Sequence, residues 1–311
     1  RDYKVTGVQT CALPICSDCS ISAKDGDDPV SFPAFGMGRP FPSDSVTFAR
    51  QYPGQDFVAQ PFEPPGEARY DPANVSNEGT RPMNIDTGTE ELLCDLSDRV
   101  LTVTLNRPQA RNALSMELMF ALRRILAEYG DHDDVGALVV TGAGSAFCAG
   151  GDVKRMAARK ADDQTAEEKF QVMVARHRET AGVIRQLRIP TVAALPGPAA
   201  GAGLALALSC DMRIAADTAF VSTGYAKVGL PGDYGASWLL TQVVGPGRAR
   251  ELMLTCERVK ADRAYEIGLF NKVVPADQLV EATRDLVTPL ANGPRVAYRY
   301  LKDNQIGRAH V

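Results

Sequence analysis

The chain has 311 residues, with 34 Lys or Arg against 38 Asp or Glu, and a formal net charge of −4. A balance this close to zero argues against a nucleic-acid-binding protein and against a basic membrane-surface protein, and no apolar run reaches the roughly 18 residues that span a membrane. The seven cysteines and three histidines form no zinc-finger pattern, so we expect a reduced, cytoplasmic setting.

Residues 1–82 differ in composition from the rest of the chain. Ten of the 20 prolines fall between Ser17 and Pro82, in a stretch rich in Gly, Ser and Asp. Such a composition does not bury enough apolar surface to offset the entropy of folding. We therefore expect 1–82 to be a non-native or disordered leader before a unit that opens at Met83. Read-through of upstream sequence and a genuine disordered extension both remain open.

The two ends of the chain share an unusual feature. Residues 5–15 (VTGVQTCALPI) and 306–311 (IGRAHV) both resemble conceptual translations of a short-read sequencing adapter. A signal peptide does not explain the first match, because the apolar run is short and Pro14 interrupts it. We expect an adapter-like segment at 5–15 and an adapter-like tail at 306–311, and we expect 83–305 to be the folded domain.

The first half of that domain contains strong local patterns. Val100–Leu105 (VLTVTL) alternates and is rich in β-branched residues, which predicts a strand. Ser115 can cap a helix that ends near Gly130. The apolar run 137–141 (ALVVT) is typical of a buried parallel strand, and the glycine-rich loop GAGSAFCAGGD follows it.

The second half continues the alternation of helices and strands. Thr165 and Glu168 form a capping box that predicts a helix to about Leu187, and Pro190 ends it. The later expectations are strands at 191–195, 212–215 and 271–274, helices at 235–243, 247–254, 261–267 and 277–291, and a last helix that ends near Gln305. Strands that alternate with helices predict an α/β fold.

Two loops rich in Gly and Ala stand out, at 145–153 (SAFCAGGDV) and 197–211 (GPAAGAGLALALSCD). Each places small residues where a strand gives way to a helix, so that backbone N–H groups can approach a ligand. Two such N–H groups aimed at one point make an oxyanion hole, which stabilises negative charge on a carbonyl oxygen. Tight helix–strand packing would explain either loop taken alone.

Four segments in order extend this pattern: NRPQARNAL (106–114), SAFCAGGDV (145–153), GPAAGAG with SCDMRIA (197–215), and AKVGLPGDYG (226–235). Together they resemble the crotonase superfamily, the enoyl-CoA hydratase/isomerase family, over nearly all of 83–305. The resemblance implies an α/β spiral of ββα turns with a C-terminal helical region that mediates trimers. We expect that region to be truncated here, so that this chain assembles poorly, whereas the intact protein is a homotrimer or a dimer of trimers.

The resemblance also implies a ligand and the residues that bind it. The ligand is an acyl-CoA, with coenzyme A as part of the substrate and with no separate cofactor or metal. The backbone N–H groups of Ala149 and Ala202 would hold the thioester oxygen. The residues expected to border the coenzyme A or the acyl group are Gly150, Gly151, Asp152, Arg107, Arg111, Ala113, Lys154, Gly201 and Tyr225. Of these, Arg107, Arg111 and Lys154 are the expected phosphate partners, although each could equally be a solvated surface charge.

The acid/base residues depart from the hydratase pattern. Hydratases of the family carry two glutamates, and this chain has Ala205 and Tyr225 at the matching places. Asp233 instead matches the aspartate of relatives that shift double bonds, such as the ring-enoyl-CoA isomerase of phenylacetate breakdown. Asp233 is thus the expected acid/base residue for double-bond isomerisation, with hydration as a further option. Without the resemblance, Asp233 in Pro-Gly-Asp would be read as a turn residue.

Two other classes were weighed. A catalytically silent acyl-CoA-binding scaffold would explain the missing glutamates, and Asp233 argues against it. An NAD(P)-dependent short-chain dehydrogenase would explain VVTGAGSAF (139–147) and the pair Tyr298 and Lys302, but Cys148 stands where its last glycine belongs. His177 is expected to be a helix-face histidine in or near the core.

Overall fold

The computed structural model describes residues 83–152 and 165–305. The expectations for 1–82, 153–164 and 306–311, Lys154 among them, lie outside these residues.

The strands are β1 (Met83–Ile85), β2 (Leu92–Ser97), β3 (Val100–Leu105), β4 (Ala137–Gly142), β5 (Thr191–Leu195), β6 (Ala199–Ala200), β7 (Met212–Ala216), β8 (Phe220–Ser222), β9 (Val259–Lys260) and β10 (Lys272–Val274). The α-helices are α1 (Met116–Tyr129), α3 (Ala166–His177), α4 (Val183–Gln186), α5 (Ala202–Ser209), α6 (Ala236–Thr255), α7 (Ala261–Glu266), α8 (Leu279–Ala291) and α9 (Arg295–Gln305), and the short turns are η3 (Pro108–Ala110), η4 (Arg178–Gly182), η5 (Ala226–Val228) and η6 (Ala276–Gln278).

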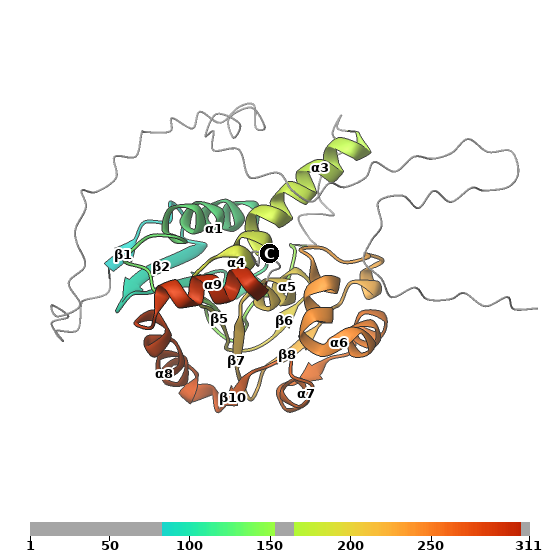
Figure 1. Cartoon of the computed structure of the whole chain (residues 1–311). Helices are drawn as coiled ribbons and strands as arrows, with labels where there is room; N and C mark the ends of the chain where they lie inside the picture. The colour runs from blue at the N-terminus through green and yellow to red at the C-terminus, as the bar shows by residue number, and fades with distance from the viewer. Residues whose placement is uncertain (1–82, 153–164, 306–311) are drawn as a thin grey trace, which may run out of the picture. The chain divides into compact units, whose positions relative to one another are not determined.

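A mixed sheet organises the domain, with strand order β1-β2-β3-β4-β5-β7-β10 (Figure 1). The pairs β1–β2 and β2–β3 are antiparallel, whereas β3, β4, β5, β7 and β10 run parallel. A second, small sheet has the order β6-β8-β9. The expected strands at 100–105, 137–141, 191–195 and 212–215 are therefore confirmed, as is the α/β class.

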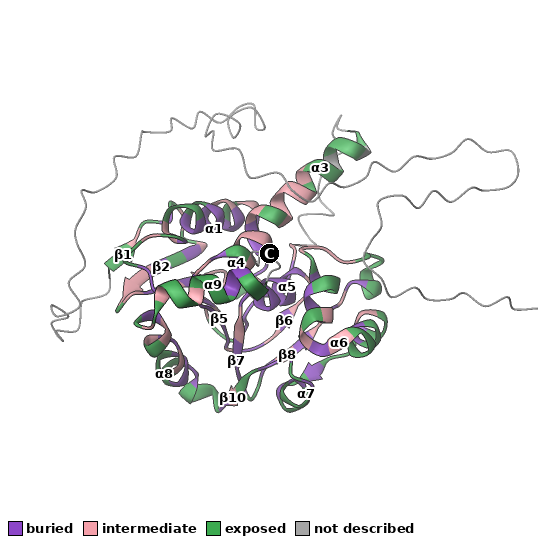
Figure 2. Ribbon diagram, in the orientation of Figure 1, coloured by how far each residue is buried: buried purple, intermediate pink, exposed green. Residues whose placement is uncertain are grey.

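Alternate residues of the sheet enter two different cores, and much of the central sheet is coloured as buried in Figure 2. Val103 and Val140 pack with α1 and α5 on one face. Val100 and Val139 pack with α8 on the opposite face. Because successive side chains of a strand point to opposite faces, a parallel strand covered by helices on both sides must be apolar throughout. This explains the unbroken apolar run of β4.

The predicted helix signals act as expected. The Ser115 hydroxyl accepts a hydrogen bond from the Leu118 N–H at 3.1 Å and caps α1. Both hydrogen bonds of the Thr165–Glu168 capping box are present at the start of α3. The expected break between two helices falls at Gly245, whose φ of 79° and ψ of 164° interrupt α6. Between α3 and α4 the chain makes a π-turn, η4, that the sequence pattern did not indicate.

Within the described ranges, no helix is both long and apolar enough to cross a bilayer. The same ranges hold no cluster of His, Cys, Asp and Glu suited to a metal ion.

The loops after β4 and β5 touch each other, because neighbouring parallel strands end at the same edge of the sheet. Cys148 and Ala199 form an isolated parallel bridge between them. A Cβ added to Gly203 would lie 2.3 Å from the Cys148 carbonyl oxygen, and one added to Gly150 would lie 2.7 Å from the Ala200 carbonyl oxygen. The glycines therefore bring two strips of backbone closer together than any larger residue would allow.

We expect Gly203→Ala to lower the free energy of unfolding by about 1–3 kcal/mol, because the added methyl group displaces backbone rather than a flexible side chain. Gly247→Ala is the matched control, since its Cβ would meet nothing within 4 Å on the exposed side of α6. It should stabilise the chain by up to about 1 kcal/mol. Urea unfolding of both variants measures the difference, and equal stabilities would contradict the close approach of the two loops.

Candidate active site

Asp233 is held by a buried tyrosine. Asp233 itself lies half-buried in the loop between η5 and α6. The hydroxyl of Tyr225, which is 5% exposed, donates a 2.6 Å hydrogen bond to Asp233 Oδ1. Burial, and then the negative charge of Asp233, raise the pKa of Tyr225, so the phenol remains a neutral donor. A donor of this kind fixes the orientation of the carboxylate.

The same tyrosine connects Asp233 to the second glycine-rich loop. A Cβ at Gly201 would lie 3.8 Å from Tyr225 Cε1, so the ring packs against this glycine. Gly201 adopts φ 51° and is the N-cap residue of α5, which begins at Ala202. The N–H of a first helical residue has no acceptor within its own helix. The predicted donor of Ala202 is therefore placed beside the Tyr225–Asp233 pair.

The N–H of Ala149, which is expected to hold the thioester oxygen, is not free in the structure. Its N–H donates to the carbonyl oxygen of Arg111 at 2.9 Å, so this group is already occupied. Its two neighbours are better placed: the Gly150 N–H makes only a 3.5 Å contact with Cys148 Sγ, and no backbone acceptor for the Gly151 N–H occurs in the described part of the chain. A Cβ at Gly150 would also lie 3.5 Å from the Ala202 nitrogen. Within the described residues, the N–H groups of Gly150 and Gly151 thus have no backbone acceptor, in contrast to that of Ala149.

The positions of the two missing glutamates are filled by packing. Ala205 is fully buried in a small apolar cluster with Tyr225 and Ala236, which Tyr234 and Met253 border. Both positions therefore hold buried apolar contacts in place of a carboxylate. Asp233 is thus the carboxylate that the described loops bring to this end of α5.

The site also contains a histidine that the sequence interpretation assigned to the core. The His177 ring stacks on the Tyr234 ring, with centroids 4.1 Å apart and an angle of 37° between the planes. Tyr234 follows Asp233 directly and adopts φ 51°, an uncommon conformation for a residue other than glycine. Burial, and then Asp233, raise the pKa of Tyr234 to about 12. His177 lies close enough to Asp233 for the two charges to interact.

A hollow of about 670 Å³ lies on the other side of the glycine-rich strips, lined by Ala149 and Ala200. Three cations border it: Arg111, Lys227 and Arg258. The guanidinium of Arg258 stands 5.0 Å from the centroid of the Phe220 ring, which also lines the hollow. Of the predicted phosphate partners, Arg111 therefore lies in a suitable place, and the sequence interpretation missed Lys227 and Arg258.

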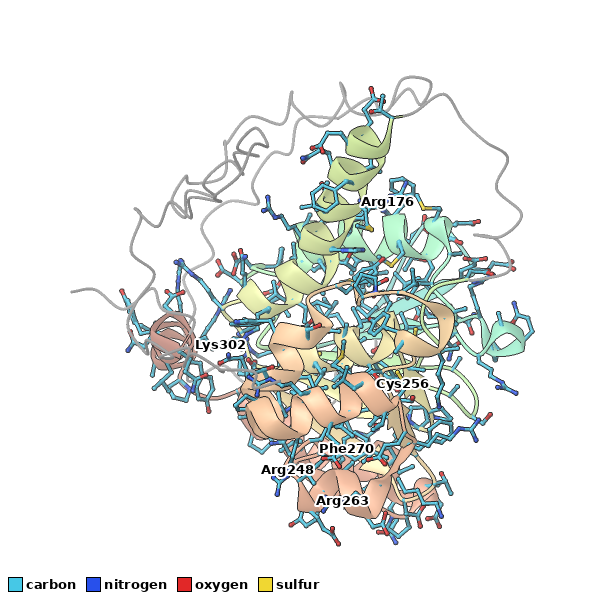
Figure 3. All side chains as sticks on the ribbon, turned by 90° about the vertical axis from the view of Figure 1, so that its right-hand side faces the viewer. Arg176, Arg248, Cys256, Arg263, Phe270 and Lys302 are labelled. Carbon is cyan, nitrogen blue, oxygen red and sulfur yellow. The ribbon has the colours of Figure 1, made fainter. Side chains whose placement is uncertain are left out.

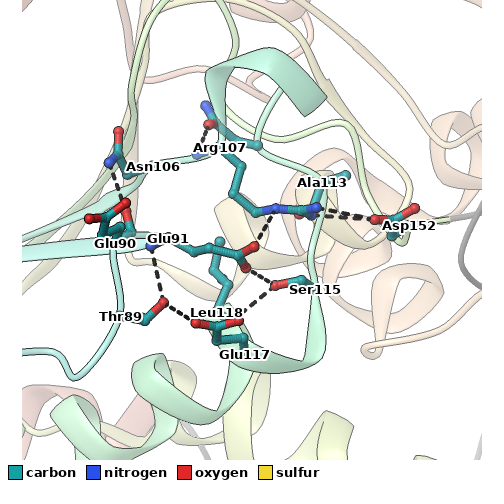
Figure 4. Close-up of polar contacts among 11 residues, drawn as sticks. Thr89, Glu90, Glu91, Asn106, Arg107, Ala113, Ser115, Glu117, Leu118 and Asp152 are labelled. Carbon is teal, nitrogen blue, oxygen red and sulfur yellow. Dashed lines mark hydrogen bonds and ion pairs between the residues drawn. The ribbon is translucent and has the colours of Figure 1, made fainter.

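Arg107, one of the predicted phosphate partners, is turned inward and is paired with protein groups (Figure 4). Its guanidinium contacts Glu91 at 3.1 Å and Asp152 at 3.3 Å, and it donates to the Ala113 carbonyl oxygen at 2.5 Å. The side chain is 12% exposed. Arg107 thus ties Asp152 and the carbonyl of Ala113 to Glu91, which directly precedes β2. The predicted contact of these residues with a ligand stays a prediction.

The two arginines of this segment should respond differently to the same substitution. Arg107→Met removes the guanidinium that pairs with two partly buried carboxylates, Glu91 and Asp152, and should lower the free energy of unfolding by about 3 kcal/mol. Arg111→Met, in the matched exposed position, should leave stability within about 0.5 kcal/mol and weaken coenzyme A binding. Thermal unfolding and calorimetric titration with coenzyme A separate the two roles, and equal stabilities would contradict the inward assignment of Arg107.

Two residues weighed for other chemistries have structural roles. Burial raises the pKa of the Cys148 thiol to about 12, as expected of a packed residue rather than a nucleophile. Lys302, labelled in Figure 3, donates to Asp211 Oδ2 at 2.6 Å and to the Ile189 carbonyl oxygen at 2.8 Å. This buried pair anchors α9, so the Lys of the apparent dehydrogenase motif is occupied.

The fold is α/β, and two glycine-rich loops place backbone N–H groups in the neighbourhood of the carboxylate of Asp233. Comparison with known proteins places it more narrowly, because residues 95–308 match the family model described as enoyl-CoA hydratase/isomerase. The chain belongs to this family. The family assignment, together with the occupied Lys302, overturns the short-chain dehydrogenase alternative.

Named relatives span several reactions. The chain is 38% identical over 214 residues to a probable enoyl-CoA hydratase of Mycobacterium bovis, covering 69% of this chain and 80% of that protein. It is 31% identical over 198 residues to a 4-chlorobenzoyl coenzyme A dehalogenase of an Arthrobacter species, covering 64% and 71%. The crystal structure of an enoyl-CoA hydratase from Bacillus anthracis superposes with a TM-score of 0.65, at 32% identity, over 70% of this chain and 83% of that one.

Proposed function

We propose that this protein is an acyl-CoA enzyme that moves a proton on an enoyl thioester, with Asp233 as its acid/base residue. One observation carries the proposal: the carboxylate of Asp233 is held at 2.6 Å by Tyr225, whose ring packs on the glycine that precedes the Ala202 donor. A base and an electrophilic site therefore lie together, as a reaction through an enolate requires.

The chemistry follows from the thioester. Its carbonyl acidifies the protons at the α carbon and, in a 2-enoyl group, at the γ carbon. Removal of the γ proton by Asp233 sends the electron pair to the thioester oxygen, where the N–H groups of Ala202 and of Gly150 or Gly151 stabilise the negative charge. Return of the same proton from Asp233 to the α carbon completes a double-bond shift, without loss or gain of atoms.

The coenzyme A would lie in the hollow bordered by Arg111, Lys227 and Arg258. Phosphates prefer cationic partners, and the Arg258–Phe220 pair offers a flat surface suited to a planar base. The proposal includes no metal and no cofactor besides the coenzyme A of the substrate. It also places the protein in the cytoplasm, as a homotrimer or a dimer of trimers, and light scattering of the purified protein tests the assembly.

A second candidate reaction is displacement of halide from an aromatic acyl-CoA. The rings of His177 and Tyr234, with centroids 4.1 Å apart and planes tilted by 37°, lie beside Asp233 and offer aromatic surface to an aromatic acyl group, and relatives named 4-chlorobenzoyl coenzyme A dehalogenase are 31% identical. In this reaction the oxygen of a water molecule bonds to the ring carbon that carries chlorine, Asp233 takes a proton of that water, and the C–Cl bond breaks with release of chloride. The negative charge that enters the ring during the attack spreads onto the thioester oxygen, so the same N–H groups would stabilise it.

Turnover assays test these proposals directly. The chain should be given 2-enoyl-, 3-enoyl-, ring-derived and 4-chlorobenzoyl-CoA, with double-bond migration, water addition and chloride release followed separately. Migration supports the first proposal, and chloride release alone supports the second. Calorimetric binding of acyl-CoA without any turnover would support a silent scaffold and contradict both.

A further inference from the structure

His177, at the end of α3, takes no part in the proton shift proposed for Asp233. This helix carries the residue into the neighbourhood of Asp233 although the two are far apart in the sequence. Its ring is positioned by stacking on Tyr234 at 4.1 Å. A histidine that merely filled the core would have its ring nitrogens satisfied by protein groups. Within residues 83–152 and 165–305, no protein group hydrogen-bonds either nitrogen of this ring.

We propose that His177 is the base that activates water at this site, which gives the centre a water-addition reaction beside the proton shift assigned to Asp233. This inference rests on the proposed function, because it requires an acyl thioester bound between the same N–H donors. The chain has Ala205 and Tyr225 where the hydratase pattern carries glutamates, and His177 is a second titratable group close enough to interact with the charge of Asp233.

The local structure fixes the histidine from both sides. Immediately after it, the π-turn η4 adds a residue to the helical turn, a feature often found at functional sites. Glu179 of this turn forms an ion pair with Arg123 of α1. The Thr180 hydroxyl donates to the Arg176 carbonyl oxygen at 2.6 Å. The backbone on both sides of His177 is thus anchored to its surroundings, while the imidazole remains half-buried.

The charged neighbours favour a neutral imidazole that can accept a proton. Burial lowers the pKa of His177, Asp233 of the loop before α6 partly offsets this, and Arg176 of α3 lowers it further. Tyr234 stacks on the ring as a neutral phenol, and Arg123 of α1 acts on that tyrosine. Because the pKa of His177 lies below the ordinary imidazole value of about 6.5, the ring is unprotonated near neutral pH.

The proposed step balances in atoms and electrons. A neutral ring nitrogen of His177 takes a proton from water, while the water oxygen bonds to the β carbon of a 2-enoyl thioester. The electron pair of the double bond moves to the thioester oxygen. The imidazolium is stabilised by the charge of Asp233, and it then delivers its proton to the α carbon as the carbonyl re-forms. The product is a 3-hydroxyacyl thioester, and both residues return to their initial states.

His177→Gln tests this role, because the amide keeps a polar side chain of similar reach but does not titrate. We expect water addition to fall about a hundredfold in kcat, with double-bond migration retained within about threefold. Arg178→Gln is the matched control on the exposed neighbour and should change neither. The wild-type rate of water addition should fall as pH drops through the pKa of His177, and this limb should be absent from the variant.

A titration independent of turnover completes the test. The imidazole signal of His177, followed by NMR in the whole chain, should titrate below pH 6.5. Asp233→Asn should lower that pKa further, because the carboxylate raises it. A pKa unaffected by Asp233→Asn, or equal loss of both reactions in His177→Gln, overturns the role of His177. A wild-type enzyme that shifts double bonds but never adds water also overturns it and leaves the proposed function standing, whereas an enzyme that does neither overturns both.

Discussion

Asp233→Asn is expected to lower kcat for double-bond migration about a thousandfold, within the range that a positioned acid/base group contributes. The amide has the shape of the carboxylate and its oxygen can still accept the hydrogen bond from Tyr225, so the fold should be unchanged. Only the ability to take up a proton is lost. Because the carboxylate acts on the reacting carbons rather than on the coenzyme A, KM should remain within about threefold.

Tyr225→Phe is the matched control for this experiment. It removes the donor but leaves the carboxylate, and the loss of one charged hydrogen bond predicts a fall of about tenfold. The raised pKa of Tyr225 means that its hydroxyl remains protonated through pH 10, so it should cause no alkaline loss of activity below that pH. Kinetics of purified, folded variants on the best substrate of the panel measure both effects. Full activity of Asp233→Asn would contradict the assignment of the carboxylate.

Much of the sheet and its covering helices followed from local pattern. The alternation of Val100–Leu105 and the apolar run 137–141 predict β3 and β4 because a parallel strand between two helical layers has few polar positions. The capping box at Thr165 predicts the start of α3 because its hydrogen bonds are local. Strands of the small sheet were not predicted, since β6 and β9 have only two residues each and depend on partners distant in sequence.

The site was harder to predict where side-chain direction decides the role. Arg107 and Arg111 lie four residues apart and look equivalent in the sequence, yet η3 and the positive φ of Arg111 turn one inward and the other to the hollow. Likewise, no local sequence signal predicts the π-turn after His177, whose Glu179 pairs with Arg123 of α1, a residue distant in the sequence. Motif position identified the strip at Ala149 but did not reveal which N–H the Arg111 carbonyl occupies.

Ala202→Pro is the second large effect that we expect, a fall in kcat between about a hundredfold and a thousandfold, which is the usual cost of removing one oxyanion donor. Proline deletes the N–H of the proposed hole without touching Asp233. The first position of a helix tolerates proline well. Residue 201 is glycine, with no Cβ to clash with the ring. The helix α5 should therefore form as before.

Ala202→Gly keeps the N–H and separates the loss of the donor from the loss of the methyl group. Ala202 is 2% exposed, so this control should show a modest loss of stability and nearly full activity. Urea unfolding and steady-state kinetics of the two variants give the comparison. Since the N–H acts mainly on the charge that develops during reaction, binding of a saturated acyl-CoA should change far less than kcat. If folded Ala202→Pro kept its kcat within about threefold, groups other than the Ala202 N–H would have to stabilise the enolate. The glycines of the two loops would then serve only the close packing of helix against strand.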